Sequence, residues 1–197
     1  MVLMGSKNVL PMVLLGRLRY SKGMELMAKA VARQKTYGDR DCLLVCEHEP
    51  VYTVGIRDKS YSEADEERLK RLGADFVRTD RGGLITFHGP GQLVVYPVLN
   101  LRNFGRTGSP VKWYVSIRVR NGVTSHGLAL NCNTDLSWYS HIVPCGITDP
   151  LAGVTSLSVE LGKPFTVETC VPLIATAFQE VFGRRVEVLE AESLSFE

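Results

Sequence analysis

The sequence predicts a single α/β domain, of the α+β kind, in which helices pack on one side of a mixed and mostly antiparallel sheet. Three observations support this class. Short apolar runs of strand length recur along the chain and are interrupted by stretches with the apolar spacing of helices. An Asn-Gly pair between alternating apolar residues predicts a hairpin. The 197 residues suffice for one domain spanning 1–197, because no linker or repeat divides them.

In the first half of the chain the expected strands and helices alternate. A helix is expected over 21–35 and a second over 62–73, with Ser62 as its N-cap and Gly73 just beyond its end. The strands are expected at 13–18, 42–48, 50–55 and 74–79. The run "CLLVCEH" at 42–48 is continuously apolar, as in a strand that is buried on both faces.

The second half is expected to add a hairpin around Asn121-Gly122 and a C-terminal helix over 166–182, closed by Gly183. Pro97 has no N–H for a ladder, so the strand containing it should end there or lie at an edge. The core face of the C-terminal helix is expected to comprise Val167, Val171, Ile174, Phe178 and Val181. The remaining strands are expected at 84–88, 92–99 and 184–189.

Composition argues against several classes of protein. The net charge of +2 is too small to indicate a nucleic-acid partner, and no apolar run reaches the roughly 20 residues of a membrane helix. Five cysteines without a C-x-x-C pair favour a reducing compartment and core thiols, Cys46 beside His48 included, over disulfides or a metal site. Residues 1–20 carry basic but no acidic side chains, which fits either a targeting peptide or a plain first strand.

The stretch "RGGLITFHGPGQ", residues 81–92, is the first candidate for chemistry. Its glycines let the backbone approach a ligand closely, Arg81 is a fixed cation, and His88 stands where a strand meets a turn. The glycine pattern matches neither a dinucleotide fingerprint nor a phosphate loop. A hairpin with incidental polar residues remains the alternative.

A second candidate is "VTSHGLALN", residues 123–131, in which His126 precedes the small-residue run Gly127-Leu128-Ala129. Small side chains leave room for a chain-like ligand. The alternative is a strand packed closely against a neighbouring element.

The third candidate is Cys145, which stands between Pro144 and Gly146 in an expected loop and should therefore be exposed. The backbone N–H groups of Cys145 and Gly146 are candidate donors to an oxyanion. An ordinary thiol needs an activating neighbour, and the candidates are His88, His126, His141 and the lysines.

Together, "RGGLITFHGPGQLVVYPVLNL", "GVTSHGLALNCNTDLSWYSHIVPCGI" and "GVTSLSVEL" resemble the lipoyl(octanoyl) transferase family, animal mitochondrial type, over residues 10 to 185. The resemblance implies the biotin/lipoate ligase-like fold and transfer of an octanoyl group from acyl carrier protein to a lysine of an apo-lipoyl domain. Such domains occur in glycine cleavage H protein and in 2-oxoacid dehydrogenase subunits. A mitochondrial location, a monomer, no cofactor, no membrane and no nucleic acid are implied as well.

By the same resemblance, Cys145 is the catalytic residue and carries the octanoyl group as a thioester. The implied substrate-binding residues are Arg81, Gly82, Gly83, Leu84, Ile85, Thr86, Phe87, His88, Gly127, Leu128 and Ala129. A thioester donor requires no ATP, and the chain lacks a phosphate loop. An ATP-dependent lipoate- or biotin-protein ligase is the alternative.

The chain departs from the family in one segment. The family's lysine segment, which activates the cysteine, should precede "IRVRNGVTSHG", but "GSPVKWYVS" stands there, with Val111 at the lysine position and Lys112 one residue away. An internal deletion near 116–117 explains this, and it leaves open an impaired isoform that only binds acyl chains or lipoyl domains.

Overall fold

Five strands form the main sheet of this computed structural model, which describes residues 8–57, 61–104, 117–147, 149 and 153–193. The strand order is β10-β1-β2-β6-β9, with β1 parallel to β10 and β2, and with β6 antiparallel to β2 and β9. The mixed sheet agrees with the prediction. The bounds are β1 Val9–Leu18, β2 Cys42–His48, β6 Gln92–Val98, β9 Leu128–Asn131 and β10 Arg185–Glu190.

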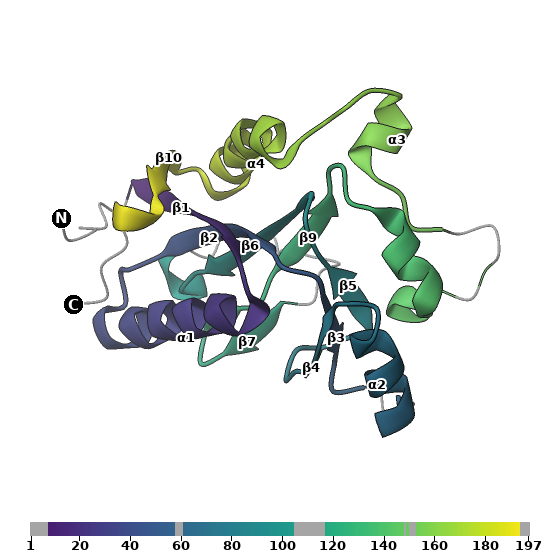
Figure 1. The fold of residues 1–197 in the computed structure, drawn as a ribbon. Coiled ribbons are helices and arrows are strands. Elements are labelled where there is room, and N and C mark those ends of the chain that lie inside the picture. The colour runs from purple at the N-terminus through teal and green to yellow at the C-terminus, as the bar shows by residue number, and fades with distance from the viewer. Residues whose placement is uncertain (1–7, 58–60, 105–116, 148, 150–152, 194–197) are drawn as a thin grey trace.

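Helices cover both faces of this sheet, so the prediction that they lie on one side is wrong. Helix α1, Tyr20–Tyr37, packs on one face through Met27 and Ala30, whereas α4, Val167–Phe182, packs on the other through Cys170 and Phe178 (Figure 1). Alternate residues of each inner strand therefore enter two different apolar clusters. This explains why residues 42–46 of β2 are all apolar.

Helix α4 begins after its N-cap Thr166 and ends at Gly183, whose φ of 63° is left-handed. Four of the five residues predicted for its core face pack on the sheet, but Val181 is 59% exposed and Phe182 packs in its place. Both positions fit helical spacing after Phe178, so sequence periodicity does not separate them.

Pro97 lies inside β6, an interior strand, so the alternative of an edge strand is wrong. The ladder between β6 and β9 ends at Val95, and the space beside the proline ring is taken by Gly127. The missing N–H therefore removes no rung of that ladder.

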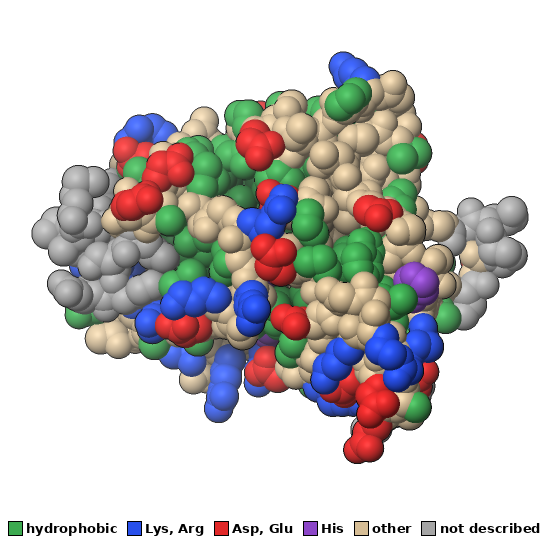
Figure 2. Space-filling model, in the orientation of Figure 1, with side chains coloured by type: hydrophobic (Ala, Val, Ile, Leu, Met, Phe, Trp, Pro, Cys, Tyr) green, Lys and Arg blue, Asp and Glu red, His purple; other side chains and the backbone are tan. Residues whose placement is uncertain are grey.

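A second, smaller sheet has the order β4-β3-β5, with bounds Asp75–Arg78, Val51–Val54 and Thr86–His88. Helix α2, Glu63–Lys70, accompanies it and begins with the predicted cap at Ser62, which forms a capping box with Asp65. Figure 2 shows basic and acidic side chains intermingled over α2, in keeping with the balanced charge of the chain.

The predicted hairpin is formed by β7, Arg118–Arg120, and β8, Val123–Ser125. Asn121 and Gly122 both have positive φ, 55° and 83°, as a type I′ turn requires. None of the described helices is long and apolar enough to span a bilayer. The short elements are η1 Leu101–Phe104, η2 Leu136–His141, η3 Pro144–Gly146, α3 Leu157–Leu161 and η4 Ala191–Ser193.

Candidate functional site

Arg81 organises the glycine loop that precedes β5. Its side chain is buried, and its guanidinium donates hydrogen bonds to the carbonyl oxygens of Thr53 (2.6 Å), Gly82 (2.9 Å) and Leu84 (2.8 Å). These bonds fold the segment 82–84 around the cation. Gly55 permits the arrangement, because a Cβ there would lie 2.3 Å from the Gly83 carbonyl oxygen.

The side chains of the stretch 81–88 divide between the core and a partly exposed face. Ile85 and Phe87 are fully buried in the apolar cluster of the small sheet, where Phe87 stacks on Trp138 at 5.0 Å. The side chains of Leu84, Thr86 and His88 keep some exposed surface. Of the predicted wall, these partly exposed residues are the ones whose side chains can meet a ligand.

Cys145 lies against this loop. Its backbone N–H donates to the Ile85 carbonyl oxygen at 2.8 Å, and its φ of 53° is left-handed, which is uncommon for a residue other than glycine. Gly146 follows with a φ of 75°, and a Cβ there would lie 2.5 Å from Leu84 Cδ1. The thiol is exposed, as predicted from the Pro-Cys-Gly corner.

The oxyanion donors proposed from the sequence are already used. The Cys145 N–H bonds to Ile85 and the Gly146 N–H bonds to the Val143 carbonyl oxygen at 3.3 Å. That expectation is wrong for this conformation, because each group has one hydrogen to give.

The other four cysteines are buried. Burial raises the pKa of the Cys42 and Cys132 thiols to about 12, and it also raises the pKa of Cys46 and Cys170. Buried protonated thiols are poor nucleophiles. Cys145 is therefore the accessible candidate among the five.

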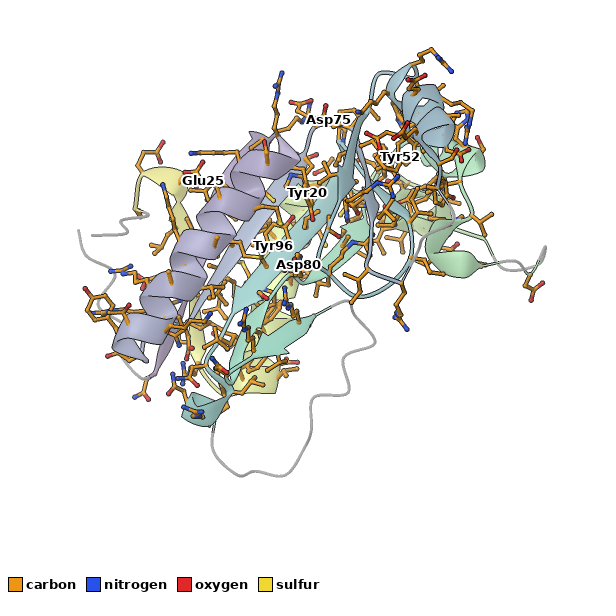
Figure 3. The ribbon with its side chains drawn as sticks, turned by 90° about the horizontal axis from the view of Figure 1, so that it is seen from below. Tyr20, Glu25, Tyr52, Asp75, Asp80 and Tyr96 are labelled. Carbon is orange, nitrogen blue, oxygen red and sulfur yellow. The ribbon has the colours of Figure 1, made fainter. Side chains whose placement is uncertain are left out.

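His88 lies next to Arg81 in a group of rings. Its ring stacks on Tyr20 at 6.1 Å and meets His48 edge-on at 6.1 Å, and its Nδ1 lies 2.6 Å from Gln92 Oε1. Burial, with smaller contributions from His48 and Arg81, lowers the pKa of His88 to about 3. The imidazole is therefore neutral at neutral pH. Figure 3 shows Tyr20 at one end of α1, with Tyr96 of β6 close to it.

His126 has a positive φ of 57° and is 5% exposed. Its Nε2 lies 3.0 Å from Asp80 Oδ1, and Arg118 pairs with the same carboxylate. Burial first, and then Arg81 and Arg118, lower the pKa of His126 to about 4. Backbone strain of this kind is concentrated at functional sites.

The small-residue run after His126 is explained by packing. A Cβ at Gly127 would lie 1.8 Å from the Val95 carbonyl oxygen, so this glycine is needed for close approach to β6. Leu128 packs on the core, and Ala129 is exposed. The packing alternative thus accounts for Gly127 without a ligand.

His141 lines a cavity of about 560 Å³ with Tyr61, Arg68 and Val143, and Leu84 and Gly146 border the same cavity. Val111 and Lys112 lie outside the described residues.

Sequence reasoning missed several residues that hold the site together. Thr53 accepts hydrogen bonds from Arg81, and Gln92 and Tyr139 connect β5, β6 and η2. The sequence signal that could have found Gln92 was an amide side chain directly after "GPG", at the first position of an expected strand.

Comparison with known families adds a second line of evidence. The model of the lipoyl protein ligase A/B catalytic domain matches residues 19–116 and 114–179. The octanoyl-[acyl-carrier-protein]:protein N-octanoyltransferase LIPT2, mitochondrial, of Danio rerio is 42% identical over 216 aligned positions, which cover 90% of this chain and 94% of that protein. The octanoyltransferase of Rubrobacter xylanophilus is 38% identical over 203 positions, covering 85% and 91%.

Among solved structures, the lipoate protein ligase Ta0514 of T. acidophilum with bound lipoic acid matches with a TM-score of 0.64 at 15% identity, covering 91% of this chain and 88% of that one. P. falciparum LipL1 in complex with lipoate matches with a TM-score of 0.62 at 14% identity, covering 91% and 65%. These likenesses confirm the expected biotin/lipoate ligase-like fold.

Proposed function

This chain belongs to the family of lipoyl protein ligase A/B catalytic domains, and we propose that it transfers an octanoyl group from octanoyl-acyl carrier protein to a lysine of apo-lipoyl domains. The relatives named as octanoyltransferases support this over the ATP-dependent ligase alternative, because they are 38–42% identical over most of the chain. The solved ligases, at 14–15% identity, bear on the fold alone.

The observation that carries the mechanism is the exposed Cys145 held against the loop of Arg81. In the first step the Cys145 sulfur attacks the donor thioester carbonyl, its bond to carbon forms, and the carrier thiol leaves with a proton. In the second step a lysine amine attacks the new thioester. The carbon–nitrogen bond forms, the carbon–sulfur bond breaks, and the amine's proton returns to the sulfur.

The acyl site is proposed to lie along the partly exposed side of the segment 81–88, with the run Gly127–Ala129 nearby. His126 joins these two segments, since it precedes Gly127 and bonds to Asp80, the neighbour of Arg81. Arg81 acts by shaping the loop, because its hydrogen bonds go to the protein's own carbonyl groups.

The proposed partners are octanoyl-acyl carrier protein and the apo-lipoyl domains of glycine cleavage H protein and of 2-oxoacid dehydrogenase subunits. A monomer acting in mitochondria is proposed as well. The location is supported by relatives whose names include the word mitochondrial, among them those of Danio rerio and Homo sapiens.

We further propose that the single domain carries an internal deletion near 116–117. The two segments matched by the family model meet at residues 114–116. The alignment with the Danio rerio protein has 216 positions, more than the 197 residues of the whole chain, although it covers 90% of them. Val111, Lys112, Trp113 and Tyr114 lie outside the described residues. The transcript around codon 116 would show a skipped exon.

The direct test of the function is mass spectrometry of the purified chain after incubation with octanoyl-acyl carrier protein. One octanoyl group should be added, on the tryptic peptide that contains Cys145, and Cys145→Ser should lose it. A chain that binds without turnover should show no covalent addition. Labelling at Cys42, Cys46, Cys132 or Cys170 would overturn the assignment of the nucleophile.

A further inference from the structure

The side chain of Gln92 is buried at the start of β6 and is 2% exposed. Its Nε2 lies 3.2 Å from the Phe87 carbonyl oxygen, 2.8 Å from Asn131 Oδ1 and 2.8 Å from the Tyr139 hydroxyl. Its Oε1 lies 2.6 Å from His88 Nδ1. One amide therefore connects β5, β6, β9 and η2.

The orientation of this amide follows from its partners. A backbone carbonyl can only accept a hydrogen bond, so the group that faces Phe87 must be the NH2 of Gln92. Asn131 is fixed in the same way, since its own NH2 donates to the Thr155 carbonyl oxygen at 3.0 Å. The atom of Gln92 that faces His88 is consequently the oxygen, which can only accept.

His88 must then donate from Nδ1. A neutral imidazole carries one proton, so Nε2 keeps its lone pair. Within the described part of the chain this Nε2 has no hydrogen-bond partner, whereas both ring nitrogens of His48 are occupied, by the Leu18 carbonyl oxygen and by the Tyr96 hydroxyl.

We infer that Gln92 is a positioning residue: it holds His88 as the Nδ1–H tautomer and so presents Nε2 as an acceptor for an N–H donor of the substrate. The role in transfer rests on the proposed function. Two sources supply such a donor, the amine of the target lysine and the amides of the carrier's prosthetic arm.

The surroundings of His88 support this assignment. The titratable and charged groups that face it are Tyr20 from α1, His48 from β2 and Arg81 from the glycine loop, with Tyr96 beyond His48. Burial and the nearby Arg81 cation disfavour the imidazolium, so the lone pair persists across neutral pH.

Gln92 also touches the segment that leads to the nucleophile. The Tyr139 hydroxyl, which accepts from Gln92, donates to the Phe87 carbonyl oxygen at 3.2 Å, and η2 ends four residues before Cys145. Burial raises the pKa of the Tyr139 hydroxyl to about 12, and the nearby Cys145 adds a smaller contribution in the same direction. A change at Gln92 should therefore affect the position of His88 and also the position of η2, the segment that leads to Cys145.

The tautomer can be read without any activity assay. Long-range proton–nitrogen correlation spectra of the 15N-labelled chain at pH 7 should resolve four imidazoles, and His88→Asn identifies the signals of His88. His88 should show a protonated Nδ1 and an unprotonated Nε2. An Nε2–H tautomer or an imidazolium in the wild-type chain overturns the inference.

The matched variants are Gln92→Leu, Gln92→Glu and Gln34→Leu. Gln34 is an equally buried glutamine whose amide bonds to Asp41 and to the Arg40 N–H, away from the site. Gln92→Leu should give a mixture of His88 tautomers, whereas Gln92→Glu should keep the Nδ1–H form, because a carboxyl group protonated on the side that faces Phe87 and Asn131 still offers an acceptor oxygen to His88. Gln34→Leu should leave the tautomer unchanged.

The two half-reactions separate the two donors. If Gln92→Leu slows octanoyl transfer to the lipoyl domain by about 10²-fold, the N–H donor is the lysine amine. If Gln92→Leu instead slows formation of the Cys145 thioester by about 10²-fold, the N–H donor is the carrier arm. Unchanged rates in both half-reactions, with the tautomer disturbed, overturn the positioning role. A wild-type chain that takes up no octanoyl group counts against the proposed function and leaves the tautomer measurement standing. If Gln92→Leu does not fold, the wild-type spectrum and Gln92→Glu still decide.

Discussion

The backbone N–H of Cys145 donates a 2.8 Å hydrogen bond to the carbonyl oxygen of Ile85. This bond ties the proposed nucleophile to the loop that Arg81 folds, although sixty residues of sequence separate the two segments. Leu84, the residue before Ile85, accepts a hydrogen bond from Arg81. The position of Cys145 therefore depends on the Arg81 guanidinium through two successive hydrogen bonds.

Arg81→Lys should therefore slow formation of the Cys145 thioester. A lysine cannot reproduce the fork that reaches Thr53 and Leu84 together, and carbonyl groups left without donors cost about 1–3 kcal/mol. Misplacement of a reacting atom by about 1 Å can cost about 10²-fold in rate. The measurement is a time course of octanoylation by mass spectrometry.

The control for this change is Arg78→Lys. Arg78 is exposed and donates to the Tyr61 carbonyl oxygen at the surface, so its stability effect should stay within about 0.5 kcal/mol. Equal octanoylation rates in the two variants would mean that the loop keeps its shape without the Arg81 fork.

Substitution of Gly127 should lower the folding stability of the chain, because this glycine lies against β6. Even the Cβ of Gly127→Ala would lie 1.8 Å from the Val95 carbonyl oxygen, a backbone atom that cannot yield without shifting β6. Gly127→Ala should lower the free energy of unfolding by about 1–3 kcal/mol, the range for overpacking. Urea unfolding measures it.

Gly82→Ala is the matched control, because nothing lies within 4 Å of the added Cβ and its φ is not left-handed. Alanine also restricts the unfolded chain, so its stability should be unchanged or higher by about 0.4–1 kcal/mol. A Gly127→Ala variant as stable as Gly82→Ala would argue that β9 can move away from β6.

Sequence patterns predicted the local elements of this fold well, for physical reasons that are visible in the structure. The cap at Ser62, the closing Gly183 and the Asn121-Gly122 turn are chemical properties of neighbouring residues, so they can be recognised without tertiary knowledge. The exposure of Cys145 followed from its Pro-Cys-Gly corner in the same way.

Properties that depend on distant neighbours were harder to predict. The sequence did not show that helices cover both faces of the sheet. A run of apolar residues indicates that a strand is buried, but it does not indicate whether a helix or another sheet covers each face. The sequence suggested that Arg81 contacts a ligand. In the structure its guanidinium instead donates hydrogen bonds to the carbonyl oxygens of Thr53 and of Leu84 in its own loop. Gln92 was overlooked because its partners are spread over residues 87–139.

The chain should lose stability as the pH falls from 6.5 towards 4.5. The pKa of His48 is lowered, that of His88 is about 3 and that of His126 is about 4, whereas an unfolded histidine titrates near 6.5. Below pH 6.5 the unfolded chain therefore binds more protons than the folded one, so the free energy of unfolding falls by up to about 1.4 kcal/mol per pH unit for each histidine.

Carboxylates add to this loss only at the acid end of the window, because unfolded carboxyl groups bind protons near pH 4, whereas hydrogen bonds and nearby cations hold the folded pKa of Glu25 at about 2 and lower that of Asp65. Urea unfolding at several pH values measures the slope of the free energy of unfolding against pH. His88→Gln should reduce this slope by the contribution of one histidine, up to about 1.4 kcal/mol per pH unit. A slope that His88→Gln does not change would mean that His88 is protonated in the folded chain.

The last prediction concerns the segment that the chain is proposed to lack. Replacing residues 105–117 by the corresponding segment of the Danio rerio relative should restore the lysine that the family resemblance places there. A nearby ammonium favours the thiolate of the nucleophile, and a lysine that also moves the proton of the attacking amine supplies about 10²–10⁴-fold in rate. The chimera should therefore transfer octanoyl groups to an apo-lipoyl domain faster than the present chain by a factor in that range. A second chimera, with the inserted lysine changed to alanine, separates the chemical effect from better folding: it should gain thermal stability but little rate. Equal turnover of the present chain and the first chimera would contradict the prediction, and it would assign the acid–base role to a group already present, such as His88 or His126.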